Sequence, residues 1–299
     1  MLACDAEGPG WRRITRPLRD TLGEGALWDA RYGVLWWVDI LAPALNRLDL
    51  ATGAIDRHTM PALLGWVALH KAGGLLGGFA DGVGVIALDP LTVGPRCDPE
   101  PHLPGNRLND GKVDAHGAVW FGTMDMAERE ACGALYRLAC DGTINCIDTG
   151  YLVPNGPAFS PCGTWMYHND TLRRQVWRYR IDGESAVARQ AFVTFDPDEG
   201  YPDGLTVDAQ GGLWITHWGG SRVSRFDPAG RRERSLALPA QQVTSLTFAG
   251  PKLDRLFATS AATGLGHDPH DGALYEIDSG GLCGLAPGVY NATINFPSV

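Results

Sequence analysis

Hydrophobic and polar residues alternate with a period of two along most of the chain. A representative stretch is YPDGLTVDAQGGLWITHWGG at 201–220, in which two alternating segments flank the polar residues DAQG. A period of two is typical of β-strands, because successive side chains point to opposite faces of a sheet. The stretch therefore predicts a strand, a tight turn and a second strand. It also places the carboxylate of Asp203 beside a segment that is suited to burial, where an unpaired charge is costly.

The same pattern recurs through the chain. Related stretches begin at Leu22, Asn106 and Val153, and each has a polar residue, then Asp or Ser five positions later, then Gly eight or nine positions later. Asp or Ser followed three residues later by Gly is typical of a type I turn. Two weaker copies place Trp66 and Thr244 at the position of the first polar residue. The resulting register positions are 24, 66, 109, 155, 203 and 244, with spacings of 41 to 48 residues.

Further alternating segments fit between these copies, namely ALNRLDL, GVGVIAL, GALYRLA, QVWRYRI, RVSRFDP and GALYEID. Four short strands in each unit of about 40 to 50 residues are the signature of a propeller blade. Six units predict an all-β fold, a six-bladed β-propeller with a central channel. We expect residues 1–299 to form a single domain, with a flexible stretch over residues 1–10. The segment WRRITRPL is expected to close the last blade, with the C-terminal tail as the alternative.

The composition of the chain limits the binding partners and the compartment that we expect for the protein. The chain of 299 residues is 44% hydrophobic and 20% charged, its net charge is −9, and its basic residues occur only singly or in pairs. Such a chain has no stripe able to neutralise phosphates, so nucleic acid is not an expected partner. No apolar run reaches the about 18 residues that a membrane span needs. The seven cysteines are odd in number and form no CxxC pair, which favours free thiols in a reducing compartment. We expect a cytoplasmic monomer.

Register alone brings several polar residues together. In a propeller the first strand of each blade lies nearest the axis, so Glu24, Asn109, Asn155 and Asp203 should meet at one end of the channel. Carboxylate and carboxamide oxygens in such a group suit a hard divalent cation. Each EG, NG or DG pair alone is more typical of a turn, whereas three in one register favour a metal site. The turn itself explains the polar residue that follows in each copy: Asp29, Asp114, Ser160 and Asp208.

Five motifs resemble those of the regucalcin/gluconolactonase family of six-bladed sugar lactonases, such as gluconolactonase or xylonolactonase. They are LGEG at 22–25, NRLNDGKVD at 106–114, GTM at 122–124, PNGP at 154–157 and YPDG at 201–204. Their order and spacing match over roughly residues 20–260. The resemblance implies one divalent metal ion held by Glu24, Asn155 and Asp203, with Asp203 also acting as the general base.

The resemblance also implies which residues meet the substrate. Arg107 and Asn109 would contact sugar hydroxyls or the lactone. The family often has an acidic residue shortly after GTM that reaches the substrate. Here GTMDMAERE departs from the regucalcin form and offers Asp125 or Glu128, and the sequence does not choose between them. Oxygen ligation admits Ca²⁺, Mn²⁺, Mg²⁺ and Fe²⁺, and Zn²⁺ is not excluded.

The expected function is hydrolysis of a small-molecule sugar lactone to the aldonic acid. A divalent ion would stabilise the oxyanion and orient water, and a carboxylate beside it would take the water's proton. The sequence leaves open a pentose or a hexose, and a γ or a δ ring. The alternatives are a metal-dependent phosphotriesterase and a non-catalytic calcium-binding propeller. GxSxG and HExxH are absent, which excludes the corresponding serine hydrolases and zinc proteases. His217 is expected to be structural, and HDPHD at 267–271 a polar loop in preference to a metal site.

Overall fold

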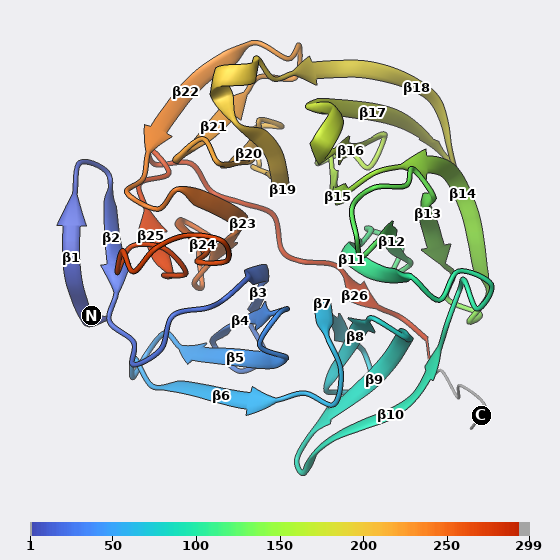
Figure 1. Ribbon diagram of the computed structural model, residues 1–299, viewed down its shortest axis with the longest axis horizontal. Coiled ribbons are helices and arrows are strands. Elements are labelled where there is room, and N and C mark those ends of the chain that lie inside the picture. The colour runs from blue at the N-terminus through green and yellow to red at the C-terminus, as the bar shows by residue number, and fades with distance from the viewer. Residues whose placement is uncertain (1, 293–299) are drawn as a thin grey trace.

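A computed structural model describes residues 2–292, and its regular structure is almost entirely β-strand (Figure 1). The helices within that range are two 3-10 turns, η1 (Thr171–Arg173) and η2 (Pro197–Glu199). Neither is long and apolar enough to cross a membrane. The antiparallel sheets are arranged around a central axis, so the prediction of an all-β propeller fold is confirmed.

Three sheets contain four consecutive strands each. The first consists of β3 (Gly23–Asp29), β4 (Val34–Asp39), β5 (Ala44–Asp49) and β6 (Ile55–Thr59). The second consists of β11 (Asn106–Val113), β12 (Val119–Asp125), β13 (Gly133–Leu138) and β14 (Ile144–Tyr151). The third consists of β15 (Pro154–Phe159), β16 (Trp165–Asp170), β17 (Gln175–Asp182) and β18 (Ser185–Thr194).

A fourth sheet has a strand from the far end of the chain. It contains β7 (Leu64–His70), β8 (Leu75–Phe79), β9 (Gly82–Leu88), β10 (Leu91–Cys97) and β26 (Val289–Tyr290). The strand β26 lies parallel to β7, whereas the other neighbours are antiparallel. The segment that leads from β25 (Tyr275–Ile277) to β26 crosses the middle of the ring (Figure 1). We call residues 283–292 the C-terminal strap.

The remaining strands form a nine-stranded sheet made of two sets. One set is β19 (Tyr201–Val207), β20 (Leu213–Trp218), β21 (Arg222–Phe226) and β22 (Arg232–Ala237). The other is β23 (Gln242–Ala249), β24 (Arg255–Ala261), β25, β2 (Trp11–Ile14) and β1 (Cys4–Gly8). The two sets pair directly at one position, Trp218 with Gln242.

The N-terminal segment belongs to this sheet. Residues Trp11 to Arg13 of β2 pair with β25, so the WRRITRPL segment supplies the closing strand, as the sequence predicts. Within the stretch expected to be flexible, Cys4–Gly8 forms β1. That strand pairs with β2 and thereby satisfies its backbone groups in a ladder.

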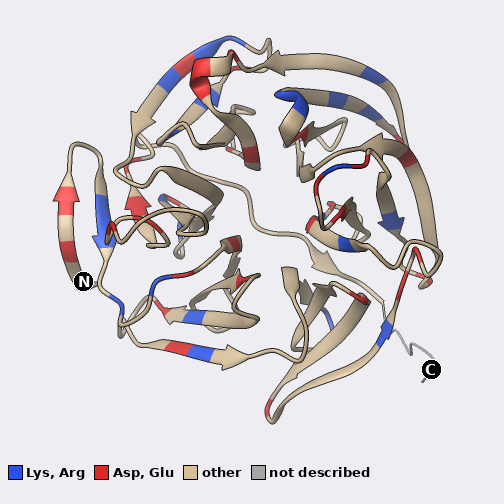
Figure 2. Ribbon diagram, viewed as in Figure 1, with Lys and Arg blue, Asp and Glu red and all other residues tan. Residues whose placement is uncertain are grey.

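Six inner strands surround the axis. Each contacts the next in chain order and the last contacts the first, so the ring is closed: β3, β7, β11, β15, β19 and β23. Lys and Arg are scattered over the outer strands and mixed with Asp and Glu (Figure 2). Arg12 with Glu276 and Arg225 with Asp208 are examples of such mixed-sign pairs.

The turns after the inner strands are held by the polar residue of the repeat. The carboxylate of Asp114 accepts the backbone N–H groups of His116 and Ala118 and the indole N–H of Trp120, the last at 2.7 Å. The carboxylate of Asp208 likewise accepts the indole N–H of Trp214, six residues further along the chain, at 2.8 Å. The turn interpretation of these residues is therefore confirmed, and each carboxylate also fixes the tryptophan of the following strand.

Trp66 does not line the channel. Its ring is fully buried between the β7 and β11 sheets, tilted against Phe121 with the ring centroids 5.8 Å apart. Gly78 and Gly111 make room for the indole, since a Cβ at Gly78 would lie 2.1 Å from it. Trp66 shares the register position of the polar residues, but these glycines let its ring pack between the sheets.

Candidate functional site

Each inner strand that carries a site motif is interrupted by a β-bulge at the motif. The ladder register shifts between Glu24 and Leu27 in β3, and between Asn155 and Ala158 in β15. A bulge adds an unpaired residue, bends the strand and re-aims the neighbouring side chain. Gly25 and Gly156 occupy these bulges with φ of 57° and 89°, a conformation that glycine adopts without strain. The EG and NG pairs are therefore bulges inside strands, and not the hairpin turns that such pairs usually form.

The bulged ends of the inner strands surround a pocket of about 190 Å³. Residues 24, 109, 155 and 203 all line it, as the register of the repeat predicts. The predicted site residues that the structure brings together here are Glu24, Arg107, Asn109, Glu128, Asn155 and Asp203. Asp125 is not among the lining residues.

Glu24, Asn155 and Asp203 are buried in the lining of the pocket, as are Arg107 and Asn109. The amide N–H of Asn155 donates to Thr171 Oγ1 at 2.9 Å, and its carbonyl oxygen accepts the amide N–H of Asn109, also at 2.9 Å. These contacts fix the orientation of the Asn155 amide. Within residues 2–292, no hydrogen bond reaches the carboxylate of Asp203. A buried carboxylate without a donor needs another source of positive charge.

The pKa values of the buried carboxylates also favour a bound cation in the pocket. Burial, and then the charge of Asp110, raise the pKa of Glu24 from 4.5 to about 8. Burial and the neighbouring Glu24 raise the pKa of Asp203 well above its usual value. Two carboxylates in a low-dielectric pocket ionise together only when a cation compensates them. Two carboxylate groups and one carboxamide oxygen are a donor set that fits a hard divalent ion.

Within residues 2–292, no three acidic, His or Cys side chains form a group that could hold an ion, either in the HDPHD loop at 267–271 or in the candidate pocket, where the proposed ligands are two carboxylates and one carboxamide. His217 is fully buried, with Nδ1 2.8 Å from the Glu199 carbonyl and Nε2 2.9 Å from Ser224 Oγ. The expectation that His217 is structural is confirmed.

Arg107 and Asn109 lie side by side at the pocket. The Nη1 group of Arg107 donates to Asn109 Oδ1 at 2.8 Å and to the Leu108 carbonyl at 3.0 Å. Asn109 donates in turn to the Pro154 carbonyl and to Asn155. These contacts tie the guanidinium to the amide that orients Asn155. In residues 2–292, Arg107 forms its hydrogen bonds through Nη1 alone, so its other N–H groups are available to a ligand.

Of the two acidic candidates Asp125 and Glu128, the structure places only Glu128 in the pocket. The Asp125 carboxylate accepts the backbone N–H groups of Ala127, Arg129 and Glu130 at 3.0 to 3.1 Å, which lowers its pKa. Asp125 therefore holds the loop that follows β12. Glu128 has a left-handed backbone with φ of 55° and lines the pocket, where its charge acts on Arg107. The loop that Asp125 caps thus presents Glu128 to the site.

Sequence reasoning missed the apolar lining of the pocket, which consists of Leu22, Ile40, Val153, Leu172, Tyr201 and Trp218. The sequence contains a signal for part of this apolar lining. Residues two positions apart on a strand share a face, and the residue two positions before each polar register position lines the pocket: Leu22, Arg107, Val153 and Tyr201.

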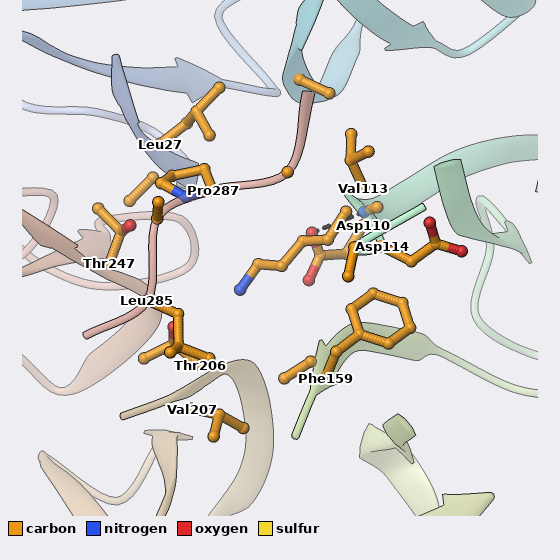
Figure 3. A pocket seen from close by; sticks show the side chains of 18 of the residues that line it. Leu27, Asp110, Val113, Asp114, Phe159, Thr206, Val207, Thr247, Leu285 and Pro287 are labelled. Atoms are coloured by element: carbon orange, nitrogen blue, oxygen red, sulfur yellow. Dashed lines mark hydrogen bonds between the residues drawn. The ribbon is translucent and has the colours of Figure 1, made fainter. Parts of the chain in front are cut away.

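A second, larger cavity of about 340 Å³ is lined by the inner strands beyond the bulges and by residues 285–288 of the C-terminal strap (Figure 3). Asp110 and Lys112 of β11 both line it. The Asp110 carboxylate accepts the N–H groups of Gly111 and Gly156, and the Lys112 ammonium donates to the Leu205 carbonyl. Burial raises the pKa of Asp110 and lowers that of Lys112, while their mutual attraction offsets both changes. The pair places one charge of each sign close to Glu24, and the effect of Asp110 on the pKa of Glu24 is larger than that of Lys112.

Comparisons with known proteins agree with this geometry. Residues 22–262 match the family model described as SMP-30/Gluconolactonase/LRE-like region. The chain is 35% identical over 269 residues to pentonolactonase XacC of Haloferax volcanii, covering 86% of this chain and 90% of that protein. It is 37% identical over 277 residues to an L-arabinolactonase of Azospirillum brasilense, covering 89% and 91%.

A solved structure shows the same fold. The calcium-binding protein regucalcin from Agrobacterium tumefaciens superimposes with a TM-score of 0.87 at 30% identity, covering 91% of this chain and 95% of that one. The resemblance noted from the motifs at residues 22–25, 106–114, 154–157 and 201–204 is thereby confirmed. The chain belongs to the SMP-30/gluconolactonase/LRE-like family.

Proposed function

We propose that this protein is a six-bladed propeller that hydrolyses a sugar lactone with the help of one divalent metal ion. The closed ring of inner strands supports the count of six blades, with the two sets of the nine-stranded sheet taken as separate blades because one residue pair joins them. The observation that carries the function is the buried group Glu24, Asn155 and Asp203, facing a pocket that also presents Arg107 and Glu128.

Glu24, Asn155 and Asp203 would hold the ion. When bound, a divalent ion there polarises a carbonyl oxygen and lowers the pKa of water. The chain's own residues supply the rest. Asp203, whose carboxylate has no other hydrogen bond in the described chain, takes the proton of the attacking water as general base. Arg107 donates to lactone and hydroxyl oxygens, Oδ1 of Asn109 accepts from a hydroxyl group, and the two residues fix the ring relative to Asp203.

The relatives support this reaction class. Proteins named pentonolactonase and L-arabinolactonase align over most of their own length with this chain. A third, named 6-deoxy-6-sulfogluconolactonase, is 33% identical over 243 residues. We infer that this chain too is a hydrolase of carboxylic esters, that its partner is a small sugar lactone, and that it acts as a monomer. Ca²⁺, Mn²⁺, Mg²⁺, Fe²⁺ and Zn²⁺ remain the candidate ions.

Replacing Glu128 with Gln is expected to raise KM for the lactone about tenfold while kcat changes little, since a charged hydrogen bond to bound substrate is lost. Steady-state kinetics on the lactone measure both constants. The matched variant is Asp125→Asn, which removes the carboxylate that caps the same loop. It should lower the thermal midpoint and change KM less than Glu128→Gln. A larger KM effect for Asp125→Asn at an unchanged thermal midpoint would reverse the assignment of the two acids.

Two other functions use the same site residues. A phosphotriesterase would also need an ion and a general base, and a calcium-binding propeller would need the ion alone. The pocket favours neither, because Arg107, Asn109 and Glu128 present hydroxyl-binding groups along one side. Such groups suit a polyhydroxylated substrate better than a bulky apolar ester.

The discriminating experiment follows proton release with a pH indicator. Chelated protein is supplied with each divalent ion in turn and offered aldonolactones and a phosphotriester, and spontaneous hydrolysis is subtracted. Turnover of a lactone above background is the expected result. Turnover of the phosphotriester alone would indicate the first alternative, and no turnover with any ion would indicate the second.

A further inference from the structure

A chain of hydrogen bonds runs through the lining of the candidate pocket, from β11 to β19. The guanidinium of Arg107 donates to Asn109 Oδ1 at 2.8 Å, and Asn109 Nδ2 donates to Asn155 Oδ1 at 2.9 Å. Asn155 Nδ2 donates to Thr171 Oγ1 at 2.9 Å, and this hydroxyl donates to the Pro202 carbonyl at 2.8 Å. All four side chains are buried, so water does not compete for these bonds.

The two ends of the chain fix the direction of every bond in it. An arginine side chain has only donors, and a backbone carbonyl has only acceptors. Because Arg107 can only donate, Asn109 offers it the amide oxygen and is left to direct its N–H group at Asn155. Because the one proton of the Thr171 hydroxyl goes to the Pro202 carbonyl, Thr171 can only accept from Asn155. Both ends therefore assign the same orientation to the Asn155 amide, with Nδ2 toward Thr171 and Oδ1 toward Asn109.

This orientation suits the role of Asn155 as an ion ligand. An amide oxygen has two lone pairs, so Oδ1 keeps one for an ion in the pocket that Glu24 and Asp203 also line. An amide turned the other way would present N–H groups to the ion, and hard cations take oxygen ligands. Within residues 2–292, Nδ2 of Asn155 donates to Thr171 alone. The N–H side of this amide therefore depends on a single hydroxyl group.

Thr171 also reaches the strand of a second proposed ligand. Its hydroxyl donates to Pro202, the residue before Asp203, and Asn169 Nδ2 donates to the carbonyl of Asp203 at 2.7 Å. Asn169 Oδ1 lies farther from the Thr171 hydroxyl, at 3.3 Å, so the Pro202 carbonyl is the nearer acceptor. The backbone N–H of Thr171 donates to the Val153 carbonyl at 2.9 Å. The hydroxyl thus links β15 and β19 from a residue whose backbone is held by a separate bond.

We propose that Thr171 is a positioning residue that sets the affinity of the site for its divalent ion, by holding the amide oxygen of Asn155 toward the ion. The inference rests on the metal-dependent function proposed above, and it adds a residue that lies outside the five sequence motifs. Groups that orient a metal ligand typically contribute 10 to 100-fold to metal affinity or activity. We therefore expect loss of the hydroxyl to raise the dissociation constant of the ion by at least about tenfold.

The first test measures ion binding directly, by calorimetry on chelated protein with Ca²⁺, Mn²⁺, Mg²⁺, Fe²⁺ and Zn²⁺ in turn. Thr171→Val keeps the branched shape and removes the hydroxyl, so the Asn155 amide is no longer held in one orientation. Thr171→Ser keeps the hydroxyl and should restore most of the affinity. Thr247→Val is the matched control, because Thr247 is 7% exposed, as Thr171 is, and does not line the pocket. Equal dissociation constants for Thr171→Val and Thr247→Val would overturn the proposal.

The second test needs no variant to fold. In a crystal structure of the unmodified protein loaded with the tightest-binding of these ions, Asn155 Oδ1 should contact the ion. Its Nδ2 should stay within about 3.2 Å of Thr171 Oγ1, the range of an N–H···O hydrogen bond. An Asn155 amide that leaves Thr171 when the ion binds would contradict the proposal.

The role of Thr171 and the proposed function fail differently. If the unmodified protein binds none of the five ions, the metal site is wrong, and the role of Thr171 is wrong with it. If an ion binds but no lactone is hydrolysed, the lactonase function is wrong, and the calorimetry still decides the role of Thr171. If lactone is hydrolysed and Thr171→Val binds the ion as tightly as the unmodified protein, only the role of Thr171 is wrong.

Discussion

Replacing Asp203 with Asn is expected to lower kcat for lactone hydrolysis by about 10³-fold, even with the divalent ion in excess. General bases contribute roughly 10² to 10⁴-fold to kcat. An asparagine still offers one carboxamide oxygen to an ion, as Asn155 does, but it cannot take a proton. The carboxylate is buried and has no hydrogen bond within residues 2–292, so no donor of the chain holds its oxygens away from a bound water. Initial rates at saturating lactone measure the effect.

A control variant tests whether the loss of kcat is specific to Asp203 or follows from removing any nearby carboxylate. Asp198 lies five residues earlier, in η2, where its side chain is exposed. Asp198→Asn should leave kcat and KM unchanged. If Asp203→Asn kept kcat within tenfold of the unmodified protein while binding the ion, Asp203 would be a ligand only, and another group would have to act as the base.

Removing the divalent ion is expected to make folding stability fall steeply between pH 5 and pH 8. In the metal-free protein, burial raises the pKa of Glu24 from 4.5 to about 8 and also raises that of Asp203. Between the unfolded and folded pKa values, the folded state binds more protons than the unfolded state. Stability therefore decreases as the pH rises through this window. One pKa unit is worth about 1.4 kcal/mol, so Glu24 and Asp203 together account for a loss of roughly several kcal/mol.

Urea unfolding of chelated protein at several pH values measures this loss directly. Glu24→Gln serves as the control, because it removes the titrating group and should flatten the pH profile of the chelated protein. Adding the ion to the unmodified protein should restore stability at pH 8, because an ion that binds only the folded state stabilises it. Equal pH profiles for chelated Glu24→Gln and the chelated unmodified protein would contradict the burial of an uncompensated charge at Glu24.

The fold and much of the site follow from the periodicity of the sequence. A period of two identified the strands, and copies spaced by 41 to 48 residues identified the propeller. Register then brought Glu24, Asn155 and Asp203 together, because equivalent residues of inner strands meet at one end of the ring. The structure places all three in one pocket. Such positions can be found from one chain alone, since they depend on backbone repetition and not on side-chain packing.

Other features depend on contacts that periodicity does not describe. The bulges at Gly25 and Gly156 look like turns in the sequence, because the same residue pairs suit both. The choice between Asp125 and Glu128 rests on backbone N–H groups that only the folded loop directs at Asp125. Trp66 occupies the right register position, but glycines on neighbouring strands draw its ring between two sheets.

The apolar lining of the pocket shows the same division between what repeats and what does not. Leu22, Val153 and Tyr201 are two residues before a register position, so the period of two could have identified them. Ile40 and Trp218 are the cross-strand neighbours of Leu22 and Tyr201, so the repeated pairing of first and second strands places both. Leu172 lies in η1, to which no other copy of the repeat has an equivalent.

The most direct test of the account is a metal titration of lactone hydrolysis by chelated protein. With a lactone identified in the substrate panel, the initial rate of proton release is followed as the divalent ion is added. We expect a rise from the spontaneous rate to a plateau at about one ion per chain, since one site holds one ion. The same titration of Asp203→Asn should stay near the spontaneous rate. A chelated protein that keeps its full rate would contradict the proposed role of Glu24, Asn155 and Asp203.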